Sequence, residues 1–152
     1  MSRLIGRGMQ VELPPGWEGA VTSGDFRELS DGARRPTVMH IASFPLPPQR
    51  GDWGSGAVQL MRKTDVFMVL FEYLPEQAGT PLFSDNEVPR QLDPSEFDET
   101  ALQEMRRGQS GLQRFFTYRG RAFCLYVVLG SHLDRKDLVP RVNEVLAGLE
   151  IE

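Results

Sequence analysis

The stretch Phe123-Cys124-Leu125-Tyr126-Val127-Val128-Leu129 is the strongest core-strand signal in the chain. β-Branched and aromatic residues favour strands, and a short continuous apolar run is typical of a strand buried on both faces. The pair Arg119-Gly120 separates this run from a second strand-like segment, residues 112–118. Two such runs joined by a short turn that contains glycine predict a β-hairpin. A further uninterrupted apolar run over 66–71 predicts another strand buried on both faces.

The N-terminal part of the chain contributes more strand patterns. Residues 9–13 alternate apolar and polar side chains, which predicts a half-buried strand. Pro14-Pro15-Gly16 ends that strand, and residues 17–22 can return beside it, so we expect an N-terminal hairpin. Residues 23–36 are polar and predict a loop. Residues 37–44 are apolar on both faces, which predicts an interior strand.

Two helices complete the pattern. Asp93-Pro94-Ser95-Glu96 is a good helix start, because Asp93 can cap it and Glu96 stands where a capping-box carboxylate belongs. We expect this short middle helix to include Met105 and to stop at Gly108. A C-terminal amphipathic helix is expected to begin near Asp137 and to end at Gly148.

The sequence therefore predicts an α+β fold, with an antiparallel sheet flanked by the middle helix and the C-terminal helix. Residues 57–61 predict one more short strand, and 149–151 could add an edge strand. The length of 152 residues suits one domain, 1–152. Residues 45–56 and 75–92 predict two long loops, and loops of this length are often functional.

Composition excludes several classes of protein. The net charge is −4, whereas nucleic-acid-binding proteins usually carry a basic excess, so we expect no nucleic-acid partner. The single cysteine excludes an internal disulfide and a multi-cysteine metal site. No apolar run approaches the roughly 20 residues that a transmembrane helix needs, and no secretory signal is visible. We therefore expect a cytoplasmic protein without a metal or cofactor.

The usual catalytic patterns are also missing. No nucleophile elbow is present, and the glycine-rich stretch 51–56 lacks the lysine and hydroxyl residue of a phosphate-binding loop. His40 lies on an inward strand face, where a satisfied core histidine is more common than a metal ligand, and His132 is not near it in the pattern. Cys124 lies inside an apolar strand, which favours a buried, unreactive thiol.

Acidic and basic clusters also have simple structural interpretations. Glu96, Asp98 and Glu99 lie near a predicted helix start, where carboxylates favour the helix dipole. An arginine and aromatic cluster could bind single strands by stacking, but the acidic segment 85–104 beside it opposes a polyanion. That cluster comprises Arg106, Arg107, Arg114, Arg119, Arg121, Phe115, Phe116 and Tyr118.

Contact residues for a protein partner are predicted in two places. Trp53 and Phe83 lie in the two long loops, where an aromatic side chain can anchor a partner. For Trp53 the alternative is a lid that packs over the edge of the sheet. The hairpin contributes Arg114, Tyr118, Arg119 and Arg121.

Two parts of the chain resemble a known superfamily. The opening Val11-Glu12-Leu13-Pro14-Pro15-Gly16-Trp17-Glu18 resembles the strand, Pro-Gly-Trp, strand start of the PsbP/Mog-type superfamily. The ending Val142-Asn143-Glu144-Val145-Leu146-Ala147-Gly148-Leu149-Glu150-Ile151 looks like its closing helix and strand. The segments 111–117 and 123–131 are also similar to a bacterial family without an assigned activity. The loops 45–56 and 75–92 depart from the superfamily pattern.

The resemblance implies an antiparallel sheet with helices against its faces and a mostly non-enzymatic function. Three functional hypotheses follow from the residues and the resemblance together. The first is an adaptor that binds a protein partner. The second is a chaperone for an apolar segment, and the third is a small-ligand binder or enzyme that uses His40, Asp65 or Glu72 in a pocket. A homo-oligomer that pairs through the strand containing Ile151 also stays open.

Overall fold

The main sheet contains five antiparallel strands. The structure is a computed structural model that describes residues 2–23 and 36–152. The strands lie in the order β3-β4-β5-β7-β6, with β5 at the centre. Their bounds are β3 Glu18–Ser23, β4 Thr37–Ala42, β5 Val66–Glu72, β6 Ser110–Tyr118 and β7 Arg121–Leu129. The predicted hairpin, the predicted interior strand and the apolar run at 66–71 are therefore all present.

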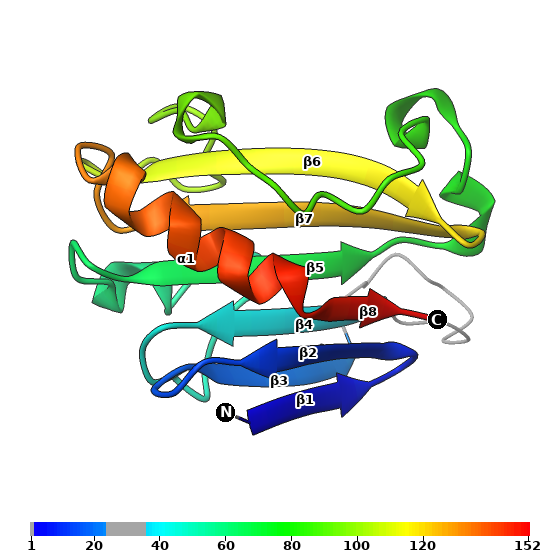
Figure 1. Cartoon of the computed structure of the whole chain (residues 1–152), viewed down its shortest axis with the longest axis horizontal. Coiled ribbons are helices and arrows are strands. Elements are labelled where there is room, and N and C mark those ends of the chain that lie inside the picture. The colour runs from blue at the N-terminus through cyan, green and yellow to red at the C-terminus, as the bar shows by residue number, and fades with distance from the viewer. Residues whose placement is uncertain (1, 24–35) are drawn as a thin grey trace.

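A second, smaller sheet and one helix cover one face of the main sheet (Figure 1). The small sheet has the order β1-β2-β8, with β1 Ser2–Gly6, β2 Met9–Leu13 and β8 Leu149–Ile151. Helix α1 spans Arg135–Ala147 and lies across the main sheet. It begins two residues before the predicted start, and Gly148 caps it as expected. β8 follows at once, which confirms the predicted edge strand.

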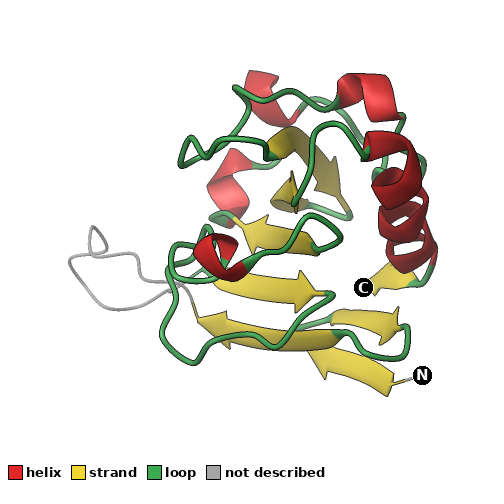
Figure 2. Cartoon of the chain, turned by 90° about the vertical axis from the view of Figure 1, so that its left-hand side faces the viewer, coloured by secondary structure: helices red, strands yellow, loops and turns green. Residues whose placement is uncertain are grey.

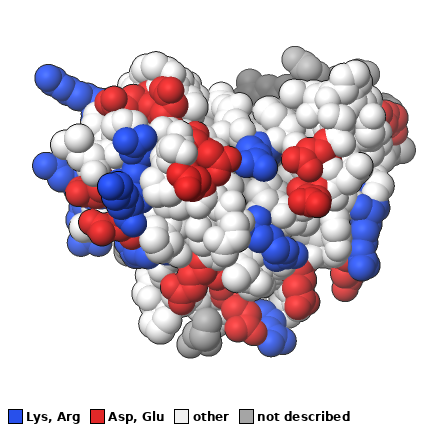
Figure 3. Space-filling view, turned by 45° about the horizontal axis from the view of Figure 1, so that its top comes forward, with Lys and Arg blue, Asp and Glu red and all other residues white. Residues whose placement is uncertain are grey.

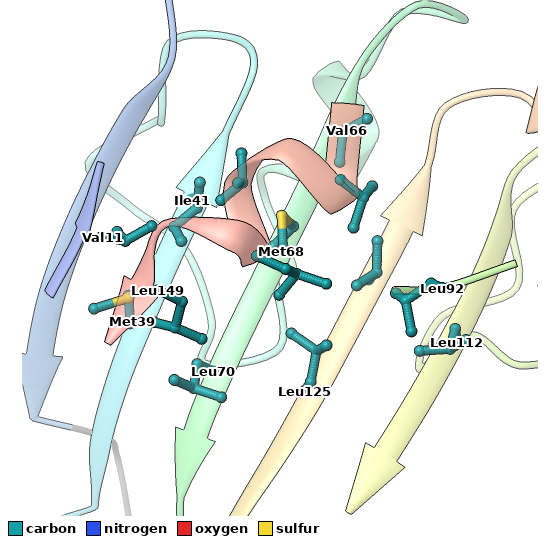
Figure 4. Packing of buried hydrophobic residues seen from close by; sticks show 14 of the residues in the cluster. Val11, Met39, Ile41, Val66, Met68, Leu70, Leu92, Leu112, Leu125 and Leu149 are labelled. Atoms are coloured by element: carbon teal, nitrogen blue, oxygen red, sulfur yellow. The ribbon is translucent and has the colours of Figure 1, made fainter. Parts of the chain in front are cut away.

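The main core lies between α1, the small sheet and the main sheet (Figure 4). Side chains alternate across a strand, so Met39, Met68 and Leu125 point to this face from three neighbouring strands. Val145, Leu146 and Leu149 close the core from the C-terminal segment.

Loops cover the opposite face of the main sheet, which Figure 2 shows edge-on. Val38, Phe67, Val69, Tyr126 and Val128 point to this face and are buried under the loop segments. The loops contain three one-turn 3-10 helices: η1 Val58–Leu60, η2 Pro75–Gln77 and η3 Pro81–Phe83. Burial on both faces explains why β5 and β7 carry no polar alternation in the sequence.

The predicted N-terminal hairpin is wrong. β2 pairs with β1 and β8, whereas β3 pairs with β4, so the two predicted partners belong to different sheets. The Pro14-Pro15-Gly16 turn directs the chain from one sheet to the other, with the Trp17 N–H donating to the carbonyl oxygen of Pro14 (3.1 Å). β1 was not predicted, because its side chains are mostly exposed and give no clear alternation.

The predicted middle helix is also wrong. The capping box forms as expected, with Asp93 accepting from the Ser95 N–H and Glu96 accepting from the Asp93 N–H. However, only the 3-10 turn η4, Pro94–Glu96, follows. Asp98 instead exchanges two backbone hydrogen bonds with Gly111 at the start of β6 (2.8 and 3.0 Å). Since these bonds use the groups that a helix would need, the segment up to Met105 stays irregular.

The predicted strand over 57–61 is the third difference. The N–H groups of Ala57 and Val58 both donate to the carbonyl oxygen of Gly54, which coils the chain into η1. The predicted loop over 23–36 lies almost wholly outside the described residues. No helix among the described residues is long and apolar enough to span a membrane.

Candidate functional site

Two tight turns with the same sequence lie at one end of the molecule. Arg7-Gly8 joins β1 to β2, and Arg119-Gly120 joins β6 to β7. All four residues have positive φ angles, 52° and 76° in the first turn and 52° and 75° in the second. Two successive positive φ angles define the type I′ hairpin turn, which favours asparagine and glycine over arginine. Both arginines are therefore held in an unfavourable backbone conformation and are exposed to solvent.

Arg121 joins these two turns. Its Nε and Nη2 donate to the two carboxylate oxygens of Glu72 on β5, both at 2.8 Å. Its Nη2 also donates to the carbonyl oxygen of Arg7 (2.8 Å), and Nη1 donates to those of Gly8 (3.3 Å) and Glu152 (3.2 Å). The bond with Glu72 raises the pKa of Arg121 above its usual value. Arg121 thus holds the small sheet against the end of the main sheet.

A hollow of about 530 Å³ opens beside the two turns. Its lining combines apolar residues with charged residues of both signs. It consists of Ile5, Gly8, Met9, Gln10, Arg90, Tyr118, Arg119, Glu150, Ile151 and Glu152. The guanidinium carbon of Arg119 lies 5.5 Å from the centre of the Tyr118 ring, so these side chains form one rim together.

A second hollow of about 520 Å³ meets the first at Arg90 and Tyr118. The segment 85–91 and Arg114 line the rest of it. Arg114 pairs with Glu96 (2.7 Å) and lies 3.9 Å from Asp85. Arg90 donates to the carbonyl oxygens of Leu146 and Leu149, both at 2.8 Å. The two hollows therefore form one surface, which we call the groove end.

The outer edge of β8 faces the first hollow. The Glu152 N–H donates to Gly8, on the β2 side, whereas the carbonyl oxygen of Leu149 accepts from Arg90, away from β2. Backbone groups alternate in direction along a strand, so the N–H and C=O of Ile151 also point away from β2. Within the described residues β8 is the last strand of its sheet, so this edge can accept another strand.

The structure brings four of the six predicted contact residues to the groove end. Tyr118 and Arg119 line the first hollow, Tyr118 and Arg114 line the second, and Arg121 lies behind the two turns. Trp53 lies elsewhere, half-buried on the loop-covered face. Its ring stacks on Phe71 at 4.8 Å with an interplanar angle of 12°, so it packs over the face of the sheet rather than its edge.

Phe83 is the sixth predicted contact residue and has only 1% of its surface exposed. It packs against the rings of Tyr73 (5.1 Å) and Phe115 (5.6 Å), so it is a core residue without surface for a partner. Conversely, the sequence did not identify Arg90, which lines both hollows, or the turn at Arg7 beside the first hollow. The repeated Arg-Gly pair was the available signal for Arg7, whereas Arg90 depends on contacts far away in sequence.

The three predicted pocket residues do not converge. His40 is buried, with Nδ1 accepting from Arg50 Nε and Nε2 donating to the carbonyl oxygen of Asp52, both at 2.7 Å. Burial is the main cause that lowers the pKa of His40. Asp65 accepts from the hydroxyl of Ser43 and from the Arg62 N–H, and Glu72 is held by Arg121 on the other face. Each therefore has a structural partner, and none lines either hollow.

One catalytic-looking arrangement appears that the sequence did not predict. The Ser110 hydroxyl lies 2.9 Å from Nδ1 of His132, and Nε2 of His132 lies 3.7 Å from a carboxylate oxygen of Glu99. Serine, histidine and a carboxylate in this order resemble the groups of a hydrolase. However, Ser110 is 0% exposed, so no substrate carbonyl can reach its hydroxyl. The bond instead fixes the start of β6 to the turn before α1.

Cys124 is buried, and burial raises the pKa of its thiol to about 12, so the thiol stays protonated near neutral pH. The three carboxylates of the acidic cluster have local partners. Asp98 accepts from the N–H and the hydroxyl of Thr100, Glu96 accepts from the Asp93 N–H, and Glu99 lies 3.7 Å from His132. No cluster of three or more His, Cys, Asp or Glu side chains that could hold a metal occurs in the described part of the chain.

Comparison with known proteins adds no relative. A scan against protein-family models, a search of curated proteins and a search of solved structures each returned no match to this chain. We therefore infer function from the groove end itself.

Proposed function

We propose that this protein is a non-enzymatic adaptor that binds an extended segment of a protein partner along β8. The observation that carries the proposal is the outer edge of β8, which opens on a hollow of about 530 Å³. Addition of a strand to a sheet edge is a common mode of peptide recognition, because backbone hydrogen bonds supply affinity and side-chain contacts supply specificity. The N–H and C=O of Ile151 would pair with the backbone of the partner.

The rim of the hollow supplies the specificity. Arg90 and Arg119 offer positive charge, Glu150 and Glu152 offer negative charge, and Tyr118 offers a ring. A segment with charged side chains of both signs fits this rim better than a purely apolar one. β8 has only three residues, so the paired length is short and we expect a transient complex.

The other two hypotheses have less support at this surface. A chaperone for an apolar segment needs a large apolar groove, but only Ile5, Met9 and Ile151 are large aliphatic residues in the lining. An enzyme needs polar groups that converge on a pocket, and His40, Asp65 and Glu72 lie apart. The resemblance to the PsbP/Mog-type superfamily and the location in the cytoplasm stay predictions.

Selection of binding peptides from a random display library tests the proposal. We expect the selected peptides to shift the backbone amide resonances of Ile151, Tyr118 and Arg119. Ile151→Pro removes the outward N–H and should weaken binding at least about tenfold, because one ladder bond and the strand geometry are lost. Ile151→Ala keeps the N–H and is the matched control, with a smaller loss expected.

The proposal fails if the selected peptides shift resonances elsewhere, for example around Trp53. It also fails if Ile151→Pro and Ile151→Ala weaken binding equally, because the backbone of β8 then plays no part. Circular dichroism of both variants establishes that the fold is retained.

A further inference from the structure

Three loops meet at the end of the molecule opposite the groove end. Gln59 Nε2 donates to Glu104 Oε2 (2.7 Å), and Gln109 Nε2 donates to the carbonyl oxygen of Val58 (2.9 Å). The His132 N–H donates to the carbonyl oxygen of Gly108 (2.7 Å). These bonds join the segments 58–63, 104–109 and 131–136 into one surface, which we call the loop end. It lies at the left of Figure 1 and faces the viewer in Figure 2.

Each segment of the loop end carries one exposed apolar side chain. Leu60 is 58% exposed, Met105 64% and Leu133 93%. Among the described residues only two other large apolar side chains, Ile5 and Leu82, are comparably exposed. A single exposed leucine needs no explanation, but three on adjoining loops form a shared feature of one surface.

Each of these apolar residues is followed by a pair of basic residues. The sequences are Leu60-Met61-Arg62-Lys63, Met105-Arg106-Arg107 and Leu133-Asp134-Arg135-Lys136. The two lysines of the chain are both among them. The three segments carry six basic and two acidic residues, a net charge of +4 in a chain of −4. In Figure 3 basic side chains gather at the left-hand end, with acidic ones between them.

Three of these basic side chains have no ion pair within the described residues. They are Lys63, Arg107 and Lys136, whereas Arg135 donates to the backbone carbonyl oxygens of Phe97 and His132. Arg62 pairs with Asp65, although its side chain stays 74% exposed. Asp65, which pairs with Arg62, and the flanking Glu99 and Asp137 lower the net charge of this surface from +4 to +1.

We propose that the loop end docks on the surface of a membrane that contains anionic lipid. Leu60, Met105 and Leu133 enter the boundary between headgroups and acyl chains, while the exposed basic side chains contact the lipid headgroups, namely those of Arg62, Lys63, Arg107 and Lys136. Peripheral membrane binding combines buried apolar area with attraction to anionic lipid, and one of these alone is weak. Lysine and arginine suit the boundary because their aliphatic stems lie along apolar surface while the charge stays in water.

Other occupants fit the loop end less well. A nucleic acid would stack its bases on aromatic side chains, whereas the three exposed apolar residues are aliphatic. The core of a protein interface is depleted of charge, whereas here each exposed apolar residue is followed within three positions by two basic residues. A lipid surface accepts separate apolar side chains, because each one enters the boundary independently.

Vesicle sedimentation of the full chain tests the proposal. The probes are vesicles of phosphatidylcholine alone and vesicles of equimolar phosphatidylcholine and phosphatidylserine. We expect binding to the anionic vesicles, little binding to the neutral ones, and release by salt. Leu133→Ser should lower the partition coefficient about tenfold, and Lys63→Gln or Lys136→Gln about fivefold each.

Matched variants elsewhere on the surface are the controls. Leu82→Ser removes a leucine of similar exposure, 59%, outside the loop end, and Arg119→Gln removes a charge at the groove end. Both should bind vesicles like the unaltered protein. The proposal is overturned if the anionic vesicles do not bind the protein, if neutral vesicles bind it equally, or if the controls lose as much binding as Leu133→Ser.

Discussion

The groove end and the loop end use basic side chains in opposite ways. At the groove end Arg121 donates to Glu72 and to backbone carbonyl oxygens, and Arg90 donates to backbone carbonyl oxygens. These bonds fix the positions of the turns and of the end of α1. At the loop end Lys63, Arg107 and Lys136 have no ion pair in the described structure and lie beside exposed apolar side chains. The same residue class therefore builds a shaped rim at one end and leaves charge available for a partner at the other.

Replacement of Gly130 should have the largest effect on stability, because the loop end is tightly packed beneath its exposed side chains. A Cβ atom at this position would overlap the carbonyl oxygen of Arg62, and the Gly130 N–H is already bonded to that of Asp65 (2.8 Å). We expect Gly130→Ala to lower the free energy of unfolding by about 3 kcal/mol. Urea unfolding measures this change.

Gly148→Ala is the control at the other end of the chain's last helix. A Cβ atom there would have only ordinary contacts, the nearest at 3.5 Å from Glu12. We expect a change of less than about 0.5 kcal/mol. Equal losses in the two variants would show that the loop end is not packed as described.

Removal of Arg121 should have the next largest effect, at the groove end. Arg121→Ala leaves Glu72 and the carbonyl oxygens of Arg7 and Gly8 without their donor, at a site where both charged side chains are about four-fifths buried. We expect a loss of about 2 kcal/mol in the free energy of unfolding. Because Arg119 is exposed and makes a ring contact only, Arg119→Ala should cost far less. A similar loss in both variants would contradict the bridging role of Arg121.

The strands of the main sheet could be predicted from the sequence, because burial on both faces leaves uninterrupted apolar runs at 66–71 and 123–129. The Arg119-Gly120 turn could be predicted for the same reason, as it lies between two such runs. The sheet partner of β2 could not, because Pro14-Pro15-Gly16 fits a change of sheet as well as a hairpin. The prediction of a middle helix was wrong because Asp98 bonds to Gly111, a contact that no local pattern encodes.

The two ends also differ in how far the sequence predicts them. The groove end was partly predicted, since Tyr118 and Arg119 follow an obvious hairpin, but Arg90 and Glu150 reach it only through the tertiary fold. The apolar and dibasic repeats of the loop end are visible in the sequence. Their meeting on one surface depends on the bonds of Gln59, Gln109 and His132.

Below pH 6.5 we expect the free energy of unfolding to depend on His40, which lies beneath the loops and belongs to neither end. Its Nδ1 accepts from Arg50, and burial lowers its pKa, so the fold favours the neutral ring. The unfolded chain binds a proton near pH 6.5, and the folded chain only at lower pH. Stability contributed by the neutral ring is therefore present above pH 6.5 and falls as the pH drops below it, by up to about 1.4 kcal/mol per pH unit.

The variant His40→Gln isolates this contribution, because glutamine does not titrate. Urea unfolding across this pH range should give a shallower slope for the variant than for the unaltered protein. Identical slopes would mean that His40 does not carry the acid sensitivity. Vesicle binding by the loop end, measured above pH 6.5, should be the same in both proteins.

Relief of the strained turn at Arg119 should have the smallest effect and should separate stability from binding. Arg119 has a φ of 52°, which costs a residue with a Cβ atom about 1 kcal/mol, whereas glycine adopts it freely. Arg119→Gly should therefore raise the free energy of unfolding by up to about 1 kcal/mol while weakening selected peptides, since it removes a charge from the rim. At the loop end the same variant should leave vesicle binding unchanged. If Arg119→Gly stabilises the fold and peptides bind as before, the strained arginine has no role in the groove, and specificity rests on Arg90, Tyr118 and the two glutamates of the rim.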